Sequence, residues 1–75
     1  MDNILKIREI LITVFPLSEM PEDILGLKIG DIPDWDSLGN FNLLLAIEDA
    51  FNVRFTVEEM SKIQSIPQII GKLNE

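Results

Sequence analysis

Ser37 is the residue whose setting most directly suggests chemistry, because it follows a loop and opens a long apolar helical stretch that ends at Phe51. It is flanked by Asp36 and Leu38. Its hydroxyl could cap the helix, act as a nucleophile, or carry a phosphodiester group. Nucleophilic catalysis is disfavoured, because the chain has no histidine and no lysine close to Ser37 in sequence. A phosphodiester is chemically reasonable, because its oxygens would meet unpaired N–H groups and the positive end of the helix dipole.

The length and composition predict one folded domain, covering residues 1–75. A chain of 75 residues is near the lower limit for a self-supporting core. Hydrophobic residues make up 47%, which is too many for a disordered chain. Because there is no cysteine and no histidine, we expect no disulfide, no thiolate or imidazole metal site and no Ser-His or Cys-His catalysis. We also expect no catalytic residue among the carboxylates, because a bundle this small could not readily enclose a pocket for them.

The chain is strongly acidic, with 13 acidic and 6 basic residues and a net charge of −7. This balance argues against nucleic-acid binding, which needs clustered Lys and Arg. It favours docking onto basic patches of partner proteins, or it serves only to keep a small domain dissolved. The apolar runs are too short to span a membrane, and the first residues do not resemble a signal peptide. We expect a soluble, monomeric, cytoplasmic domain.

Four helices are expected from hydrophobic periodicity and capping residues. They should cover residues 3–15, from 36 or 37 to about 51, 57–63, and from after 65 to about 73. Pro16 stops the first helix, and Asn52 is a suitable terminator for the second. Thr56 and Glu59 predict a capping box before the third helix. Ser65 begins a similar capping pattern before the fourth helix, where a proline in the first turn is tolerated.

Residues 16–36 form a long connection that must be ordered, since an unstructured loop of this length would be unusual in a compact domain. Its apolar side chains can hold it against the helices, and residues 22–25 can form one short turn. Residues 27–29 could be extended, but they have no evident partner strand. We interpret Trp35 as a residue that packs this loop. The predicted fold is an all-α small four-helix bundle with three main helices, one short helix and a long ordered loop between the first and second.

The second helix has two apolar faces, whereas a surface helix normally needs one. One arc contains Leu43, Ala46, Ile47, Ala50 and Phe51, and Leu44 lies between this arc and the other. The other arc contains Leu38, Phe41 and Leu45, with Glu48 in its middle. Because burial of an unpaired carboxylate is unfavourable, we expect the arc with Glu48 to face solvent and to form a protein contact edged by Glu48 and Asp49. The alternative is a central helix that is buried on both sides.

These features together resemble the acyl and peptidyl carrier proteins, the phosphopantetheine-binding carrier family. The resemblance covers nearly the whole chain: Leu25-Gly26-Leu27, then Trp35-Asp36-Ser37-Leu38, then residues 43–51 with their Leu-x-x-Ile-Glu-x-x-Phe spacing. It implies that Ser37, within the Asp36-Ser37-Leu38 motif, carries 4'-phosphopantetheine derived from coenzyme A. It also implies that the thiol of this group holds an acyl or aminoacyl group as a thioester and presents it to partner enzymes.

The chain departs from fatty-acid carriers, which usually have acidic residues soon after the serine, where this chain has Gly39 and Asn42. The motif also resembles D-alanyl carriers and discrete carriers of specialised polyketide, lipid or peptide-type pathways. The implied partners are a phosphopantetheinyl transferase and the enzymes that load and process the cargo. An unmodified helical interaction module, in which Ser37 is only a cap, is the alternative.

Overall fold

The computed structural model describes residues 3–74 and consists of four helices joined by loops. The helices are α1 (Asn3–Val14), α2 (Ser37–Phe51), α3 (Val57–Lys62) and α4 (Ile66–Leu73). No β-strand forms within residues 3–74, so the predicted all-α class is confirmed. α1 and α3 each end one residue earlier than the sequence pattern predicts.

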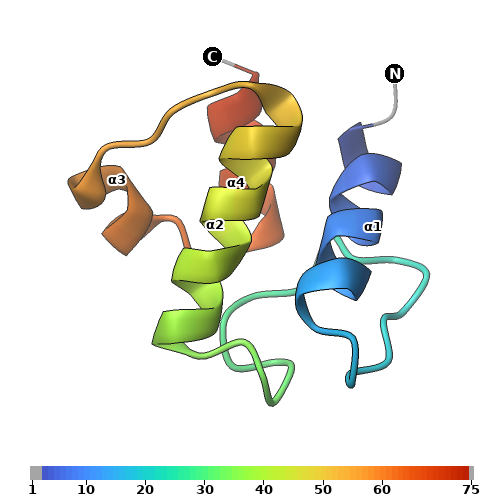
Figure 1. Ribbon diagram of the computed structural model, residues 1–75. Helices are drawn as coiled ribbons and strands as arrows, with labels where there is room; N and C mark the ends of the chain where they lie inside the picture. The colour runs from blue at the N-terminus through green and yellow to red at the C-terminus, as the bar shows by residue number, and fades with distance from the viewer. Residues whose placement is uncertain (1–2, 75) are drawn as a thin grey trace.

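The helices are arranged around α2 (Figure 1). In that view α2 lies between α1 and α3, while α4 lies behind it. α1 runs in the opposite direction to α2, and α4 runs in the same direction as α2. The beginning of α1 and the end of α4 therefore lie at one end of the molecule, and α2 begins at the other end. None of the helices within residues 3–74 is long and apolar enough to cross a membrane.

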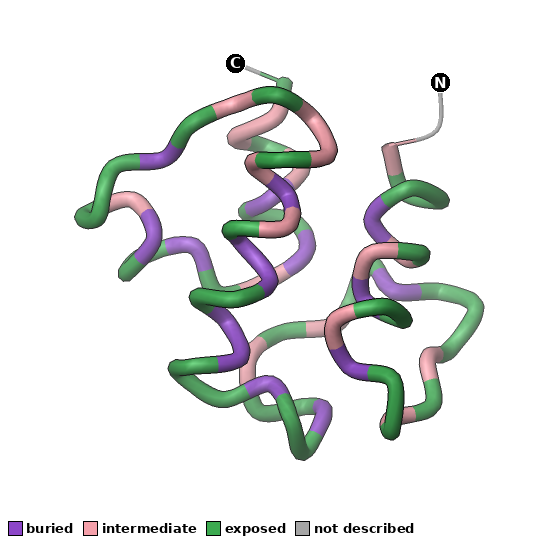
Figure 2. Tube along the Cα trace, in the orientation of Figure 1, coloured by how far each residue is buried: buried purple, intermediate pink, exposed green. Residues whose placement is uncertain are grey.

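The core is built from the apolar faces of all four helices and from the long loop. Buried and exposed positions alternate along the helices (Figure 2). The fully buried large side chains are Ile7, Leu11, Ile24, Trp35, Leu43, Leu44, Ile47, Ile66 and Ile69. Ile4, near the start of α1, is exposed. At the surface, Lys6 joins α1 to the end of α2. It donates a hydrogen bond to the carbonyl of Ala50, and its Nζ lies 4.8 Å from the ring centroid of Phe51.

The predicted capping residues define the helix ends. Asn52 ends α2 in the left-handed region with φ 56°, a conformation that asparagine tolerates well. The capping box at Thr56 is complete, because the Glu59 N–H donates to Thr56 Oγ1 and the Thr56 N–H donates to Glu59 Oε1. Ser65 caps α4 and accepts a hydrogen bond from the N–H of Gln68.

The long loop is ordered, but two of its details differ from expectation. Residues 22–25 form no helical turn; the chain turns instead at residues 25–26, where the Leu27 N–H donates to the Ile24 carbonyl. The segment around Lys28 does find an extended partner, because Lys28 pairs with Ser65 in an isolated antiparallel bridge. This partner is the link between α3 and α4, too short to be recognised as a strand in the sequence.

The end of the loop packs under the start of α2. Trp35 is fully buried, and its ring stacks on Phe15 with a centroid distance of 6.1 Å. The predicted packing role of Trp35 is therefore confirmed. Earlier in the loop, Arg8 of α1 donates hydrogen bonds to the carbonyls of Met20 and Pro21. These contacts fix both halves of the loop and thereby position the first turn of α2.

Candidate functional site

Ser37 is the first residue of α2, and Asp36 is the residue that caps the helix. The Asp36 carboxylate accepts a hydrogen bond from the Gly39 N–H at 2.8 Å. Ser37 is exposed, and its hydroxyl has no hydrogen-bond partner among residues 3–74. Of the two capping candidates, only Asp36 fills the role, which leaves the Ser37 hydroxyl available for chemistry.

The helix start also offers unpaired donors beside this hydroxyl. The N–H groups of Ser37 and Leu38 have no protein partner within the described residues, because the intrahelical hydrogen bonds begin with the Asn40 N–H. Together with the helix dipole, such groups favour an anionic substituent. Asp36 is itself anionic and lies next to this position, so its carboxylate opposes part of that attraction. The arrangement is compatible with a phosphodiester on Ser37.

Gly39 is required by a close backbone approach. A Cβ atom at this position would lie 2.2 Å from the carbonyl oxygen of Asp34 and 3.1 Å from the ring of Phe15. The loop before α2 therefore packs directly against the first turn of the helix. Any side chain at residue 39, an acidic one included, would displace this loop. The missing acidic residue thus has a packing reason, whereas Asn42 is exposed and has no such constraint.

Asn40 is a buried polar residue whose role was not predicted from the sequence. It is 5% exposed, and its Oδ1 accepts a hydrogen bond from Trp35 Nε1 at 2.9 Å. Its Nδ2 donates to the Ile63 carbonyl, also at 2.9 Å. One side chain therefore joins the loop before α2 to the end of α3. The only indication of this role in the sequence was that Asn40 is a polar residue at a position where the helical pattern predicts a core residue.

A groove beside Ser37 lies between the start of α2 and α3. It has a volume of about 290 Å³ and is lined by Ile29, Ser37, Asn40, Phe41, Val57, Met60, Ser61 and Gln64. Met60 and Asn40 are buried members of this lining, whereas Val57, Ser61 and Gln64 are exposed. The groove is therefore open to solvent along α3 and closed towards the core.

The two apolar faces of α2 have the predicted orientations. Leu38, Phe41 and Leu45, which we call the apolar strip, are 69%, 45% and 43% exposed. On the opposite arc Leu43 and Ile47 are fully buried, whereas Ala46, Ala50 and Phe51 are half-buried. Leu44, between the arcs, is also fully buried. The interpretation of α2 as a helix buried on both sides is wrong. The apolar strip runs from Ser37 along the outside of the molecule.

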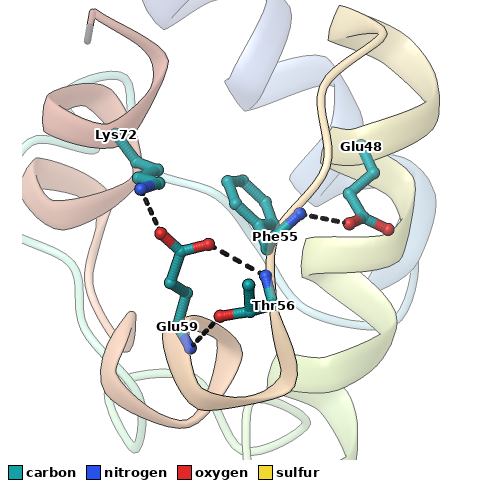
Figure 3. Close-up of polar contacts among 5 residues, drawn as sticks. All are labelled: Glu48, Phe55, Thr56, Glu59 and Lys72. Carbon is teal, nitrogen blue, oxygen red and sulfur yellow. Dashed lines mark hydrogen bonds and ion pairs between the residues drawn. The ribbon is translucent and has the colours of Figure 1, made fainter.

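The two carboxylates at the far end of the strip are not equivalent. Asp49 is exposed, as predicted for a charged edge. Glu48 is only partly exposed, and its Oε2 accepts a hydrogen bond from the Phe55 N–H at 2.6 Å (Figure 3). The expectation that Glu48 is an unpaired carboxylate is therefore wrong. Glu48 holds the loop between α2 and α3 in place.

A second polar contact fixes α3 to α4. Lys72 of α4 forms an ion pair with the Glu59 carboxylate of α3 (Figure 3). The hydrogen bond from Lys72, followed by that from the Thr56 backbone, holds the pKa of Glu59 below its ordinary value of 4.5. α3 forms one wall of the groove, and Glu59 attaches it to α4. Glu48 attaches the loop that precedes α3 to α2.

Comparisons of this chain with protein-family models, with curated proteins and with solved structures found no match. Within residues 3–74, no group of three or more acidic side chains is placed to hold a metal ion.

Proposed function

We propose that this chain is a carrier protein of the phosphopantetheine-binding kind, folded as a four-helix bundle and without catalysis of its own. The observation that carries the proposal is the division of roles at the start of α2: Asp36 caps the helix, so the exposed Ser37 hydroxyl has no structural duty. Ser37 also lines the groove between α2 and α3, and it directly precedes Leu38, the first residue of the apolar strip. A modified serine needs both a free hydroxyl and surfaces that a modifying enzyme can reach.

Attachment would join Ser37 Oγ to the phosphate of the phosphopantetheine half of coenzyme A. The pyrophosphate bond of coenzyme A breaks, adenosine 3',5'-bisphosphate leaves, and the serine proton passes to a base of the transferase. When bound, the group supplies a thiol on a flexible arm that can hold an acyl or aminoacyl group as a thioester. The N–H groups of Ser37 and Leu38 would face the phosphate.

The apolar strip supports the second requirement of a carrier, which is transient docking to several enzymes. Leu38, Phe41 and Leu45 form a contiguous exposed apolar surface that begins next to Ser37. Exposed apolar patches of this kind mark protein contacts. We assign to this surface a phosphopantetheinyl transferase and the acyl- or aminoacyl-loading and processing enzymes of a specialised pathway. The absence of charge at Gly39 and Asn42 favours apolar contacts over ionic ones near the serine.

The direct test is the intact mass of the protein after co-expression with a phosphopantetheinyl transferase of broad specificity. The wild type should gain the mass of one phosphopantetheine group, and peptide mapping should place it on Ser37. Ser37→Ala should gain nothing and should unfold at nearly the same urea concentration as the wild type. Asp36→Ala is the matched structural control, and it should lose about 1 kcal/mol of stability because it removes the helix cap. Modification of Ser37→Ala at another residue would refute the assignment.

A second candidate function is an unmodified interaction module. It is favoured by the apolar strip alone, because a partner helix could lie against Leu38, Phe41 and Leu45 without any cofactor. A wild-type mass that stays unchanged with several transferases would favour this function over the carrier.

A further inference from the structure

One of the two buried residues that line the groove beside Ser37 is polar. This residue is Asn40, and both ends of its amide are engaged: Oδ1 accepts from Trp35 Nε1, and Nδ2 donates to the Ile63 carbonyl. No buried side-chain polar atom within residues 3–74 lacks a partner. Any group that passed from the groove into the core beside Asn40 would separate these pairs. Buried donors and acceptors would then be left unsatisfied, which is strongly unfavourable.

The second barrier is packing. Met60 is the other buried residue of the groove lining, and Leu44 and Ile63 belong to the same core cluster. Leu44 is fully buried and Ile63 nearly so. A long alkyl chain would have to displace these side chains, and closely packed cores resist such insertion.

The outer part of the groove has a different character. Ser61 and Gln64 lie along it and are exposed, so polar groups of a ligand can remain hydrated there. Its volume of about 290 Å³ is near the lower end of the range of roughly 300–1,000 Å³ for small-molecule sites. The groove is suited to a short or polar group.

We infer that the carried group is a short acyl or an aminoacyl group that stays in the groove between α2 and α3, because Asn40 closes the core to longer alkyl chains. This inference rests on the proposed attachment at Ser37 and restricts its cargo. Asn40 is a positioning residue in this scheme, since it acts by holding the groove floor in place.

The test compares loaded forms of the wild-type protein. A transferase attaches acylated arms directly from acetyl-, butyryl-, hexanoyl- and octanoyl-coenzyme A, and Tm is measured for each product. If the chain entered the core, each further buried methylene group would raise Tm by roughly 3–6 °C. We expect Tm to stay within about 2 °C from acetyl to octanoyl, well below the increment of one buried methylene.

Methyl NMR spectra of the same samples give an independent readout. Signals of Val57 and Met60, which line the groove, should shift on loading, whereas those of Leu44 and Ile47 should not change with chain length. A Tm that climbs with chain length, accompanied by shifts of Leu44 and Ile47, would overturn the inference while leaving attachment at Ser37 intact. Failure of attachment would instead show as an unchanged mass, and it would remove the proposed function together with the inference.

Two matched variants test the role of Asn40 itself. Asn40→Ala removes the polar side chain, so Tm should become dependent on chain length. Asn42→Ala, an exposed residue of the same helix, should behave like the wild type. If folded Asn40→Ala shows no such dependence, Asn40 is not the barrier and its assigned role is wrong. If Asn40→Ala does not fold, the wild-type series still decides.

Discussion

Single residues at the start of α2 determine how Ser37 is presented. Asp36 satisfies the Gly39 N–H, Gly39 admits the loop backbone, and Asn40 fastens the helix to the end of α3. Each of these residues lies within three positions of the serine and has a different structural role. The serine itself contributes nothing to this framework. Its substitution should therefore abolish the proposed modification and leave folding almost unchanged.

Gly39→Ala should destabilise the protein by about 1–3 kcal/mol, the usual cost of overpacking a well-packed site. The added Cβ atom would lie 2.2 Å from the Asp34 carbonyl oxygen, so the loop or the helix must move. Gly71→Ala is the matched control in α4, where nothing lies within 4 Å of the new Cβ atom. It should stabilise the helix by roughly 0.5–1 kcal/mol. Urea unfolding of both variants provides the measurement, and equal effects of the same sign would contradict the assigned close approach.

At the scale of helices, α2 carries two surfaces with separate purposes. One arc packs in the core, and the apolar strip faces solvent. α3 is only six residues long and depends on its attachments, namely the Thr56–Glu59 capping box and the Glu59–Lys72 ion pair. The Glu48 hydrogen bond fixes the loop that precedes it.

Leu44→Ala and Leu45→Ala form a matched pair on α2, because they are neighbouring residues of the same type with different burial. Leu44 is fully buried and Leu45 is 43% exposed. Leu44→Ala should cost about 2–5 kcal/mol of stability, and Leu45→Ala should cost about 1 kcal/mol or less. The effect on docking should be the opposite. Among the folded variants, only Leu45→Ala should raise the KM of the transferase for this protein. Comparable losses of stability would mean that the apolar strip is part of the core.

The Glu59–Lys72 contact predicts a pH dependence that belongs to α3. Because the folded-state pKa of Glu59 lies below 4.5, the contact stabilises the protein fully above that pH. Its contribution is lost as the pH falls below 4.5 and through the folded-state pKa. Wild type should therefore exceed Glu59→Gln in stability at pH 7, and the difference should shrink on acidification. Urea unfolding at pH 7 and at acidic pH measures the difference in stability between the two proteins. The same difference should be smaller when both carry Lys72→Met. A gap that widens in acid would disprove the assignment.

Over the whole molecule, the basic residues are largely occupied by internal contacts. Lys28, Lys62 and Lys72 pair with acidic side chains, while Lys6 and Arg8 donate to backbone carbonyls. The remaining acidic surface therefore dominates the field that an approaching partner meets. Such a field steers association and is screened within about 8 Å at physiological ionic strength.

Charge reversal should separate the two carboxylates at the end of the apolar strip. Asp49→Lys should slow the transferase reaction at low salt by roughly two- to tenfold, with little effect on stability. Glu48→Lys should slow it as well and should also lower Tm, because the Phe55 N–H loses its acceptor. Reaction rates at increasing salt for wild type and both variants test this. Curves that stay parallel would show that these charges only keep the domain dissolved.

Local signals explain what the sequence could predict. The caps at Thr56 and Ser65 involve residues at most three positions apart, so their patterns could be read directly. For α2 the sequence left Asp36 and Ser37 as alternatives, and the structure identifies Asp36 as the cap. The two faces of α2 followed from helical periodicity. In contrast, the contact between Asn40 and Ile63 and the bridge between Lys28 and Ser65 join distant parts of the chain. No spacing rule indicates which distant backbone group a buried side chain will meet, so the groove floor required the structure.

The position of the chain ends has a practical consequence for how the molecule can be tethered. α1 starts and α4 finishes at the end of the molecule opposite to the start of α2 (Figure 1). A linker, an affinity tag or a solid support joined at either end would therefore leave the serine end facing away from the attachment. The proposed attachment site would therefore stay accessible in an immobilised or fused copy.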